Sequence, residues 1–481
     1  MKLRQIAERC SDLQCTEGGE LEIRMVCSDS RQVKEGGLFI AIEGYRENGL
    51  KYVEDALHKG AVALVVEERF RANLKEHAGA PICYTQNARK CALNIARAFY
   101  DYPSKSFSLI GVTGTNGKTT VTYLLEAILR AHGKNPGIIG TVSYRYNNVV
   151  EKAHNTTPDP MFTQSLFSEM RKGAVSHVVM EVSSHALAMD RIRTEDFDIA
   201  VFTNLSQDHL DFHADMEDYF KAKSSLFTSL RRNAEVVINS DDGYGKKLLS
   251  LTRGKVHTFG ISGTPDFLGE IDTLTLSGTK CSVNGQEFEM GLVGEHNVYN
   301  FLAAYAVSRL LSIHDDTIRA ALLEIKYIPG RFERVGEGNV FVDYAHTPDA
   351  LDHLLDAANR LKIGRIITVF GCGGDRDRKK RPVMGSVVEG KSNLAIVTSD
   401  NPRTEDPIAI IEDIRKGLKG QNHLIISDRK EAIFRAIEIA EKDDIVLIAG
   451  KGHEDYQILK DRTIHFDDRE IALEAMRVLG K

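Results

Sequence analysis

Hydrophobic positions along the chain follow two alternating patterns. Short segments rich in apolar residues, such as those at 38–42, 61–68 and 107–112, are typical of buried strands. Between such runs, apolar residues recur at helical spacing, and after the third run one helix face carries Val121, Leu124, Leu125, Ile128 and Leu129. Strands that alternate with helices predict mostly parallel sheets covered by helices, so the expected fold class is α/β.

The order of these elements predicts three domains, at 1–102, 103–329 and 330–481, because 481 residues are too many for one core. The first is expected to be a small α/β domain. The second is expected to hold a mostly parallel, doubly wound sheet with a β-rich insert at about 255–292. After the hinge-like Ile328-Pro329-Gly330, the strand–helix rhythm restarts and predicts a Rossmann-like doubly wound domain.

The segment GVTGTNGKTT (111–120) predicts a site for a nucleoside triphosphate. A glycine-rich turn between a strand and a helix offers backbone N–H groups to phosphate, Lys118 can reach the terminal phosphates, and the Thr119 hydroxyl can ligate Mg²⁺. The usual first glycine falls on Val112, so an ordinary glycine-rich turn is the alternative. The residues expected to hold ATP here are Gly114, Thr115, Asn116, Gly117, Lys118, Thr119 and Thr120.

Composition excludes several classes of protein. A net charge of −6 with interspersed signs argues against a nucleic-acid partner. No apolar run approaches the roughly 20 residues that a membrane span needs. The seven cysteines include no C-x-x-C pair, so we expect reduced thiols in a cytoplasmic protein and no metal bound through sulfur.

Two polar residues stand where predicted strands end, Glu181 and His209, and ligands of parallel sheets collect at such ends. Other readings of the nucleotide site are weaker. A GTPase switch lacks an N-K-x-D segment, and GCGGD (371–375) alone is poor evidence for a nicotinamide cofactor. An inactive nucleotide-binding scaffold stays open, because a sequence does not measure turnover.

Eleven segments, taken in order, resemble motifs of the Mur ligases, the ATP-dependent amide-forming enzymes of peptidoglycan precursor synthesis. They are SDSR (28–31), TGTNGKTT (113–120), NTTPD (155–159), MEVSSHAL (180–187), TNLSQDHLDFH (203–213), GEHNVYN (294–300), PGRFERV (329–335), VDYAHTPDAL (342–351), FGCGGDRDRKKRP (370–382), SDNPRTEDP (399–407) and AGKGHEDYQ (449–457). SDSR together with DNPR resembles the branch that adds the third residue of the stem peptide.

The resemblance implies that ATP phosphorylates a carboxylate and that an amine then displaces the phosphate. It assigns catalysis to Lys118, Glu181, His209 and Lys223. It further implies two Mg²⁺ ions held by Thr119, Glu181, His209 and Lys223, the lysine as an N6-carboxylysine carbamate formed with CO₂. Asn297, Arg331 and Asp343 would complete the ATP site. Each residue also has a purely structural alternative: Glu181 as a strand-end carboxylate, His209 as a turn histidine and Lys223 as a solvated helix lysine.

The implied nucleotide-sugar substrate is UDP-N-acetylmuramoyl-L-alanyl-D-glutamate. Its expected contacts are Ser30, Asn155, Thr156, Thr157, Ser183 and Arg191. Hydroxyls and an arginine suit a ligand that carries carboxylates. A helix-capping loop is the alternative for NTTPD, and Met189 departs from the polar residue that some relatives carry.

The amino-acid substrate implied is meso-2,6-diaminopimelate, whose distal carboxylate calls for a cation with fork geometry, supplied by Arg403. The expected contacts are Arg376, Asp400, Asn401, Pro402, Arg403, Gly450 and Glu454. The alternatives are an L-lysine-adding enzyme and a folylpolyglutamate synthetase-like ligase, although the latter lacks a domain before the phosphate loop. A monomer is expected.

Overall fold

The computed structural model describes residues 1–44, 47–74 and 79–481. It contains mixed α/β structure with parallel sheets, as the alternating pattern predicts, and divides into two compact units. The first unit contains residues 1–111, 135–198 and 225–234, and the second contains 112–134, 199–224 and 235–481. The predicted domain boundaries after residues 102 and 329 stay predictions.

A five-stranded sheet in the order β1-β5-β4-β3-β2 forms the N-terminal part of the first unit. Its strands are β1 (Gln14–Cys15), β2 (Met25–Cys27), β3 (Gly37–Ile40), β4 (Ala61–Glu67) and β5 (Ile82–Thr85). Only β1 runs antiparallel to its neighbour. The helices are α1 (Leu3–Arg9), α2 (Val53–His58) and α3 (Ala88–Phe99). Alternate side chains of β4 enter different cores, Ala63 and Val65 on one face and Leu64 and Val66 on the other.

Two cysteines of this sheet correct the expectation of reduced thiols. Cys15 and Cys83 lie directly opposite each other on the antiparallel strands β1 and β5, with their Cα atoms 4.2 Å apart, and form a disulfide. The two cysteines are 68 residues apart in the sequence, so their pairing can be recognised only when the register of β1 against β5 is known. Cys10, Cys27, Cys91, Cys281 and Cys372 are free and buried, as expected for ordinary thiols.

The rest of the first unit joins parallel and antiparallel strands. Strand β7 (Pro136–Ile139) pairs in parallel with β10 (His177–Glu181) and in antiparallel fashion with β8 (Ser143–Tyr146), which in turn pairs with β9 (Val149–Lys152). Helices α5 (Pro160–Lys172) and α6 (Ser184–Ala188) flank β10 in the chain. Arg97 of α3 holds Asp196 through two hydrogen bonds of 2.8 and 3.1 Å, which ties the N-terminal sheet to this part.

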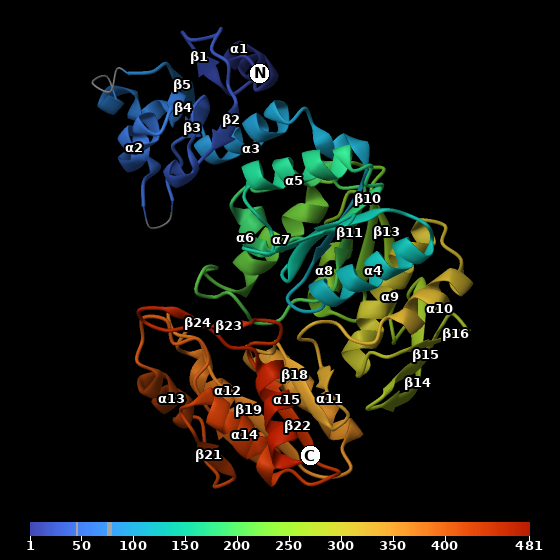
Figure 1. Ribbon diagram of the computed structural model, residues 1–481. Coiled ribbons are helices and arrows are strands. Elements are labelled where there is room, and N and C mark those ends of the chain that lie inside the picture. Colours follow the sequence, from blue (N-terminus) through green and yellow to red (C-terminus); the bar gives the residue numbers. More distant parts are fainter. Residues whose placement is uncertain (45–46, 75–78) are drawn as a thin grey trace. The chain divides into compact units, whose positions relative to one another are not determined.

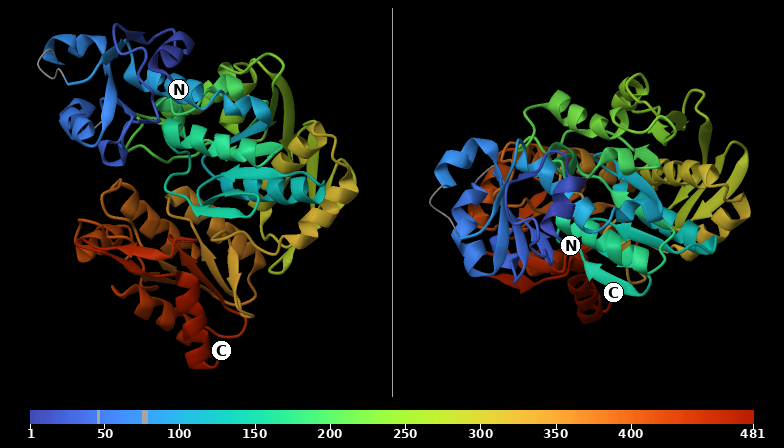
Figure 2. Two further views of the ribbon diagram at one scale, coloured as in Figure 1. Left: turned by 45° about the horizontal axis from the view of Figure 1, so that its top comes forward. Right: turned by 90° about the horizontal axis from the view of Figure 1, so that it is seen from above.

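Strand β6 (Ser108–Thr113) and helix α7 (Met216–Thr228) each begin in one unit and end in the other. In the second unit, β11 (Ile199–Phe202), β12 (Glu235–Asn239), β13 (Lys255–Gly260) and β14 (Phe267–Thr275) pair in parallel. Antiparallel β15 (Gly278–Val283) and β16 (Gln286–Met290) follow, which confirms the predicted β-rich insert. The helices are α4 (Lys118–Ala131), α8 (Gly243–Leu249), α9 (Glu295–Leu310) and α10 (Asp315–Glu324). Figure 2 shows α9 and α10 beside the insert.

The C-terminal part of the second unit is a six-stranded sheet in the order β17-β18-β22-β19-β20-β21. Its strands are β17 (Glu333–Val335), β18 (Val340–Asp343), β19 (Ile366–Phe370), β20 (Leu394–Val397), β21 (His423–Ile425) and β22 (Ile445–Ala449). All pairs but β17–β18 are parallel, as the predicted doubly wound domain requires.

Helices cover both faces of this sheet, as Figure 1 shows in orange and red. One core contains side chains of α11 (Pro348–Leu361), α12 (Lys380–Lys391) and α13 (Pro407–Arg415), and the other those of α14 (Arg429–Ile439) and α15 (Asp468–Leu479). A hairpin of β23 (Tyr456–Ile458) and β24 (Thr463–His465) follows β22. The short 3₁₀ helices are η1 (Ser30–Gln32), η2 (Gly49–Tyr52), η3 (Glu68–Leu74), η4 (Pro103–Ser106) and η5 (Thr194–Asp196). Within the described residues, every helix is too short or too polar to cross a membrane.

Candidate active site

The glycine-rich loop between β6 and α4 has a backbone that requires its glycines. Gly114 and Gly117 have φ angles of +152° and +86°. A Cβ atom at Gly114 would lie 1.9 Å from the Thr203 hydroxyl, and one at Gly117 would lie 2.1 Å from the Asn300 side-chain oxygen. The loop therefore packs too tightly for any other residue at these two positions.

The loop ends at Lys118, the first residue of α4. The Lys118 Nζ donates to the carbonyl oxygens of Gly114 at 2.8 Å and Thr115 at 2.9 Å, so the ammonium lies across the loop. Asn204, after β11, fixes the loop. The Thr115 amide donates to its carbonyl oxygen and the Asn116 amide to its side-chain oxygen, at 2.9 Å each. The N-terminus of α4 and the Lys118 ammonium thus meet at a glycine-rich loop, which is an arrangement that binds phosphate.

Two further predicted ATP residues are Arg331, which contacts the first turn of α4, and Asp343, whose charge interacts with that of Arg331. The Arg331 Nη2 donates to the buried Thr119 hydroxyl at 3.3 Å. Asp343, at the end of β18, accepts the backbone amides of Phe332 and Ala345 at 2.7 Å each. Burial raises the pKa of Asp343, and the nearby Arg331 guanidinium opposes that rise.

The remaining predicted ATP residues lie on α4 and α9. Thr120 is buried in the first turn of α4. Asn297 is buried in the first turn of α9, donates to the Val293 carbonyl oxygen at 2.8 Å and accepts from Asn300 at 3.0 Å. Since Asn300 is the side chain that abuts Gly117, the amide pair connects α9 to the phosphate loop.

His209 and Lys223 approach the same loop from two other segments. Lys223 of α7 is 1% exposed, and its Nζ donates to the Gly114 carbonyl oxygen at 2.9 Å, the oxygen that Lys118 also contacts. Burial, reinforced by the Lys118 ammonium, holds the pKa of Lys223 well below its usual value. His209 has a φ angle of +55°, and its ring lies 6.0 Å from that of Tyr219, over which Lys223 sits.

Glu181, in the first unit, is the last residue of β10 and is 1% exposed. Its carboxylate accepts the backbone amide and the hydroxyl of Thr141 at 2.9 and 2.8 Å. That hydroxyl lies 3.0 Å from the Thr156 hydroxyl. The strand-end position predicted for Glu181 is therefore confirmed, and its carboxylate is held in a fixed orientation.

The residues predicted to contact the nucleotide sugar form a network around Glu181. Thr157 donates its hydroxyl hydrogen to the Glu181 carbonyl oxygen at 2.7 Å and accepts the Ser183 amide at 3.0 Å. Arg191 donates to the Thr157 carbonyl oxygen at 3.0 Å. The Tyr144 hydroxyl donates to the Asn155 carbonyl oxygen at 2.7 Å. Asp159, not Thr157, caps α5, so capping does not explain Thr157. Ser30 lies in η1, after β2.

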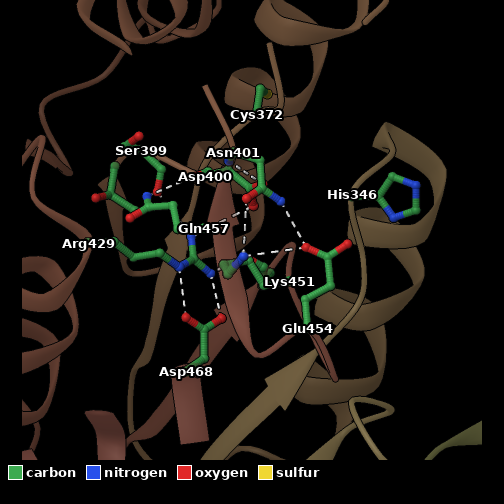
Figure 3. Close-up of polar contacts among 12 residues, drawn as sticks. His346, Cys372, Ser399, Asp400, Asn401, Arg429, Lys451, Glu454, Gln457 and Asp468 are labelled. Atoms are coloured by element: carbon green, nitrogen blue, oxygen red, sulfur yellow. Dashed lines mark hydrogen bonds and ion pairs between the residues drawn. The ribbon is translucent and has the colours of Figure 1, made fainter. Parts of the chain in front are cut away.

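Most residues predicted for the amino acid gather at the carboxyl ends of β20 and β22, on the loops that follow these strands. Asn401 donates to Glu454 at 2.8 Å, and a Cβ atom at Gly450 would lie 2.6 Å from the Asp400 carboxylate. Arg403 has a φ angle of +54° and donates to the Gly374 carbonyl oxygen at 2.9 Å. Figure 3 shows Asp400, Asn401 and Glu454 close together. Pro402 packs its carbonyl against Gly374, and Arg376 is exposed.

Several contacting residues escaped the sequence reasoning. Asp349 of α11 accepts from Asn116 of the phosphate loop at 3.1 Å and from the Ser206 hydroxyl at 2.5 Å. Lys451 is buried between Asn401 and Glu454. Both stand inside motifs quoted above, VDYAHTPDAL and AGKGHEDYQ, and their charge was the available signal.

The donor set fits magnesium better than a softer metal. Within the described residues, no group of three or more His, Cys, Asp or Glu side chains is arranged to hold a metal ion. The Thr119 hydroxyl in the second unit and the Glu181 carboxylate in the first are each of the oxygen type that Mg²⁺ takes when substrate phosphates and water supply its other ligands.

Comparison with known protein families gives three matches along the chain. Residues 22–100 match the Mur ligase family, catalytic domain; 112–308 match the Mur ligase middle domain; and 330–452 match the Mur ligase, glutamate ligase domain.

Curated relatives match nearly the whole chain. It is 43% identical over 469 residues to the UDP-N-acetylmuramoyl-L-alanyl-D-glutamate--2,6-diaminopimelate ligase of Halalkalibacterium halodurans, covering 95% of each chain. It is 45% identical over 465 residues to the protein of the same name from Caldanaerobacter subterraneus, again covering 95% of each.

Solved structures show the same architecture. One, titled as the structure of a UDP-N-acetylmuramoyl-L-alanyl-D-glutamate--2,6-diaminopimelate ligase, has a TM-score of 0.68 and 31% identity, and the match covers 100% of this chain and 99% of that one. MurF from Acinetobacter baumannii has a TM-score of 0.68 at 15% identity, with 99% and 98% covered. Folylpolyglutamate synthase from Mycobacterium tuberculosis has a TM-score of 0.61 at 18% identity, with 82% and 95% covered. The last two likenesses show a shared fold alone.

Proposed function

The chain belongs to the Mur ligase family, and we propose that it is the ligase that joins meso-2,6-diaminopimelate to UDP-N-acetylmuramoyl-L-alanyl-D-glutamate. The observation that carries the proposal is the cluster of Asp400, Asn401, Arg403 and Glu454 at the ends of β20 and β22. It combines carboxylates with a guanidinium, which suits a substrate with two ammonium and two carboxylate groups. Curated relatives at 42–45% identity carry the name of this activity.

The reaction consumes ATP in two steps. The γ-phosphoryl group passes from ATP to a substrate carboxylate, which forms an acyl phosphate and releases ADP. The amine of the amino acid then attacks the acyl carbon, loses a proton and expels inorganic phosphate. Both steps bring anions together, so Lys118 and the N-terminus of α4 stabilise the charge that develops on the transferred phosphoryl group.

Other residues of this chain orient the reactants. Arg331 and Asp343 are proposed to hold the nucleotide beside Thr119, and Thr157, Ser183 and Arg191 are proposed to hold the muramoyl dipeptide near Glu181. Bound Mg²⁺ would supply positive charge that draws phosphate and carboxylate together. Two Mg²⁺ ions are expected, and their proposed protein ligands are Thr119, Glu181, His209 and Lys223.

Lys223 is proposed to act as a carbamate. An ammonium does not ligate a cation, whereas a neutral amine can add to CO₂ and lose a proton to give an anionic carbamate. Burial favours the neutral amine of Lys223, which supports this modification. Its position beside the carbonyl oxygen of Gly114 would then place a carboxylate-like group near the phosphate loop.

The enzyme is further proposed to act in the cytoplasm, because its substrates are ATP and a nucleotide-activated precursor, and to be a monomer. Five free buried cysteines agree with a reducing compartment. The Cys15–Cys83 disulfide does not, and it makes the oxidation state of these two thiols in the purified protein worth measuring.

Phosphate release is expected to require ATP, the UDP-muramoyl dipeptide and diaminopimelate together, because the acyl phosphate forms on one substrate and is consumed by another. Steady-state phosphate release, with each substrate omitted in turn, measures this dependence. Comparable release with ATP alone would indicate a switch or transport ATPase, and a preference for L-lysine over diaminopimelate would reassign the amino-acid specificity.

Arg403→Ala is expected to raise the KM for diaminopimelate by about two orders of magnitude. The guanidinium would lose paired charge-assisted hydrogen bonds to the distal carboxylate, each worth on the order of 1.5–3 kcal/mol. The KM values for ATP and the UDP-dipeptide should move little, since Arg403 belongs to the loop after β20. Initial rates at varied diaminopimelate measure the change.

Arg435→Ala is a matched control, because this half-exposed arginine of α14 pairs with Glu438 on the surface of the same domain. Unchanged diaminopimelate kinetics in Arg403→Ala would remove Arg403 from the site while the ligase assignment stands.

A further inference from the structure

Lys451 is a fully buried lysine that lies between two residues proposed to bind the amino acid. Its side chain has 0% exposure, and its Nζ lies 3.4 Å from both the Asn401 side-chain oxygen and the Glu454 carboxylate. The third acceptor is the Tyr456 carbonyl oxygen. Figure 3 shows the Lys451 nitrogen between Asn401 and Glu454. All three ammonium hydrogens therefore have acceptors, and two of these belong to proposed ligands.

The three side chains form a closed set of contacts across two loops. Asn401 donates to the Glu454 carboxylate at 2.8 Å while its oxygen accepts the Ile458 amide at 2.9 Å and faces Lys451. Asn401 follows β20, and Lys451 and Glu454 follow β22. One cation thus connects the two loops that carry most of the proposed amino-acid site.

A second buried cation supports these loops from beneath. Arg429 is fully buried and donates to Asp468 at 2.7 and 2.8 Å. It also donates to the Ala449 carbonyl oxygen at 3.0 Å and the Ser399 carbonyl oxygen at 3.5 Å. Arg429 thus holds the backbone at the ends of β20 and β22, whereas two of the three Lys451 contacts are with side chains, those of Asn401 and Glu454.

We propose that Lys451 is a positioning residue of the amino-acid site: it fixes the orientation of Asn401 and Glu454 and keeps Glu454 ionised to receive a substrate ammonium. The inference rests on the proposed function and adds a residue to it. Lys451 itself makes no contact with substrate in this role, since its three donors are used within the protein.

The charges around Glu454 explain why a cation is needed there. Burial raises the pKa of Glu454, and the Lys451 ammonium opposes that rise more than any other group. The ionisable groups that face Glu454 are Lys451, Asp400, Tyr344, Tyr456 and Arg429. Without Lys451, the Asp400 carboxylate would favour protonation further, and a protonated Glu454 has no charge to offer an ammonium.

Kinetics of Lys451→Met test the proposal, because methionine replaces the stem without the charge. We expect the KM for diaminopimelate to rise about tenfold or more near neutral pH, with kcat and the KM for ATP within about threefold of the native values. The increase should shrink as pH rises, because Glu454 becomes ionised at higher pH in the variant. Lys451→Gln, which keeps a hydrogen-bond donor, should show a smaller increase with the same pH trend.

Lys430→Met is the matched control, since Lys430 is a half-exposed lysine of the same domain that pairs with Glu474. It should leave every kinetic constant and its pH profile unchanged. A Lys451→Met enzyme with the native KM, or with a KM raised equally at all pH values, would overturn the proposed role. A loss confined to kcat would also contradict it.

A second measurement separates this inference from the proposed function. The pKa of Glu454 can be followed by the carbon chemical shift of its carboxyl group in glutamate-labelled protein, assigned with Glu454→Gln. It should rise in Lys451→Met by about one unit or more, whatever the enzyme's substrate. An unchanged pKa would refute the charge role. Native protein that ignores diaminopimelate would instead refute the proposed function.

Discussion

Lys223→Ala is expected to lower kcat by about a thousandfold or more, and short carboxylates such as formate or acetate are expected to restore part of the loss. The size of the effect is that of removing a group that stabilises transition-state charge. Lys223 is buried beside the Gly114 carbonyl oxygen, next to the Lys118 ammonium. An uncharged cavity there would leave the proposed second metal without its carboxylate-like ligand, and a small carboxylate can fill that cavity.

Lys221→Ala is the control for this experiment, because Lys221 lies two residues earlier on α7 and is exposed. It should retain native turnover. Thermal melting of Lys223→Ala, measured alongside, separates a folding defect from a chemical one, and rescue by carboxylates requires a folded enzyme. Near-native activity in folded Lys223→Ala would show that the second-metal assignment is wrong.

The fold could be predicted from the sequence wherever the pattern of apolar residues is local. The apolar run before Glu181 became β10, the helical spacing after the phosphate loop became α4, and the segment at 255–292 became β13 to β16. Each of these depends on neighbours within a few residues, and burial of one face or one run is enough to specify it.

Features that join distant segments could not be predicted in this way. The Cys15–Cys83 pair depends on the register of β1 against β5, and the contact of Asp349 with Asn116 joins residues 233 positions apart. The left-handed backbone of Arg403 has no signal in its own residue type, since arginine seldom adopts it. Lys451 stands between two glycines, a context typical of a solvated turn, so its own neighbours in the sequence give no sign that it is buried.

The candidate site shows the same division. The end of a predicted strand indicated Glu181, because a carboxylate at the end of a parallel strand is recognisable in sequence, whereas Asp343 and Asp400 were implied only by the resemblance to the Mur ligases. Which partners hold them was visible only in the structure: Thr141 for Glu181, and the amides of Phe332 and Ala345 for Asp343. Residue type thus indicated which side chains belong to the site, whereas long-range packing determined how those side chains are oriented.

Lys118→Ala is expected to reduce turnover by at least about a thousandfold, with no rescue by carboxylates. Its ammonium lies across the glycine-rich loop, bonded to the Gly114 and Thr115 carbonyl oxygens, so folding positions the charge before phosphate binds. Preorganised charge stabilises the transferred phosphoryl group without the cost of reorientation. Single-turnover phosphate release measures the loss.

Comparing Lys118→Ala with two other variants shows what the Lys118 ammonium contributes. Lys134→Ala, at an exposed position after α4, should behave as the native enzyme. Lys118→Arg keeps the charge but replaces the compact ammonium, which bonds the Gly114 and Thr115 carbonyl oxygens, with a planar fork of different geometry, so it should also be nearly inactive. ATP affinity should fall far less than turnover, because the backbone amides and the N-terminus of α4 still bind phosphate. A variant that loses ATP binding and turnover in equal measure would show that Lys118 serves binding alone, and the transition-state role assigned to it would then be wrong.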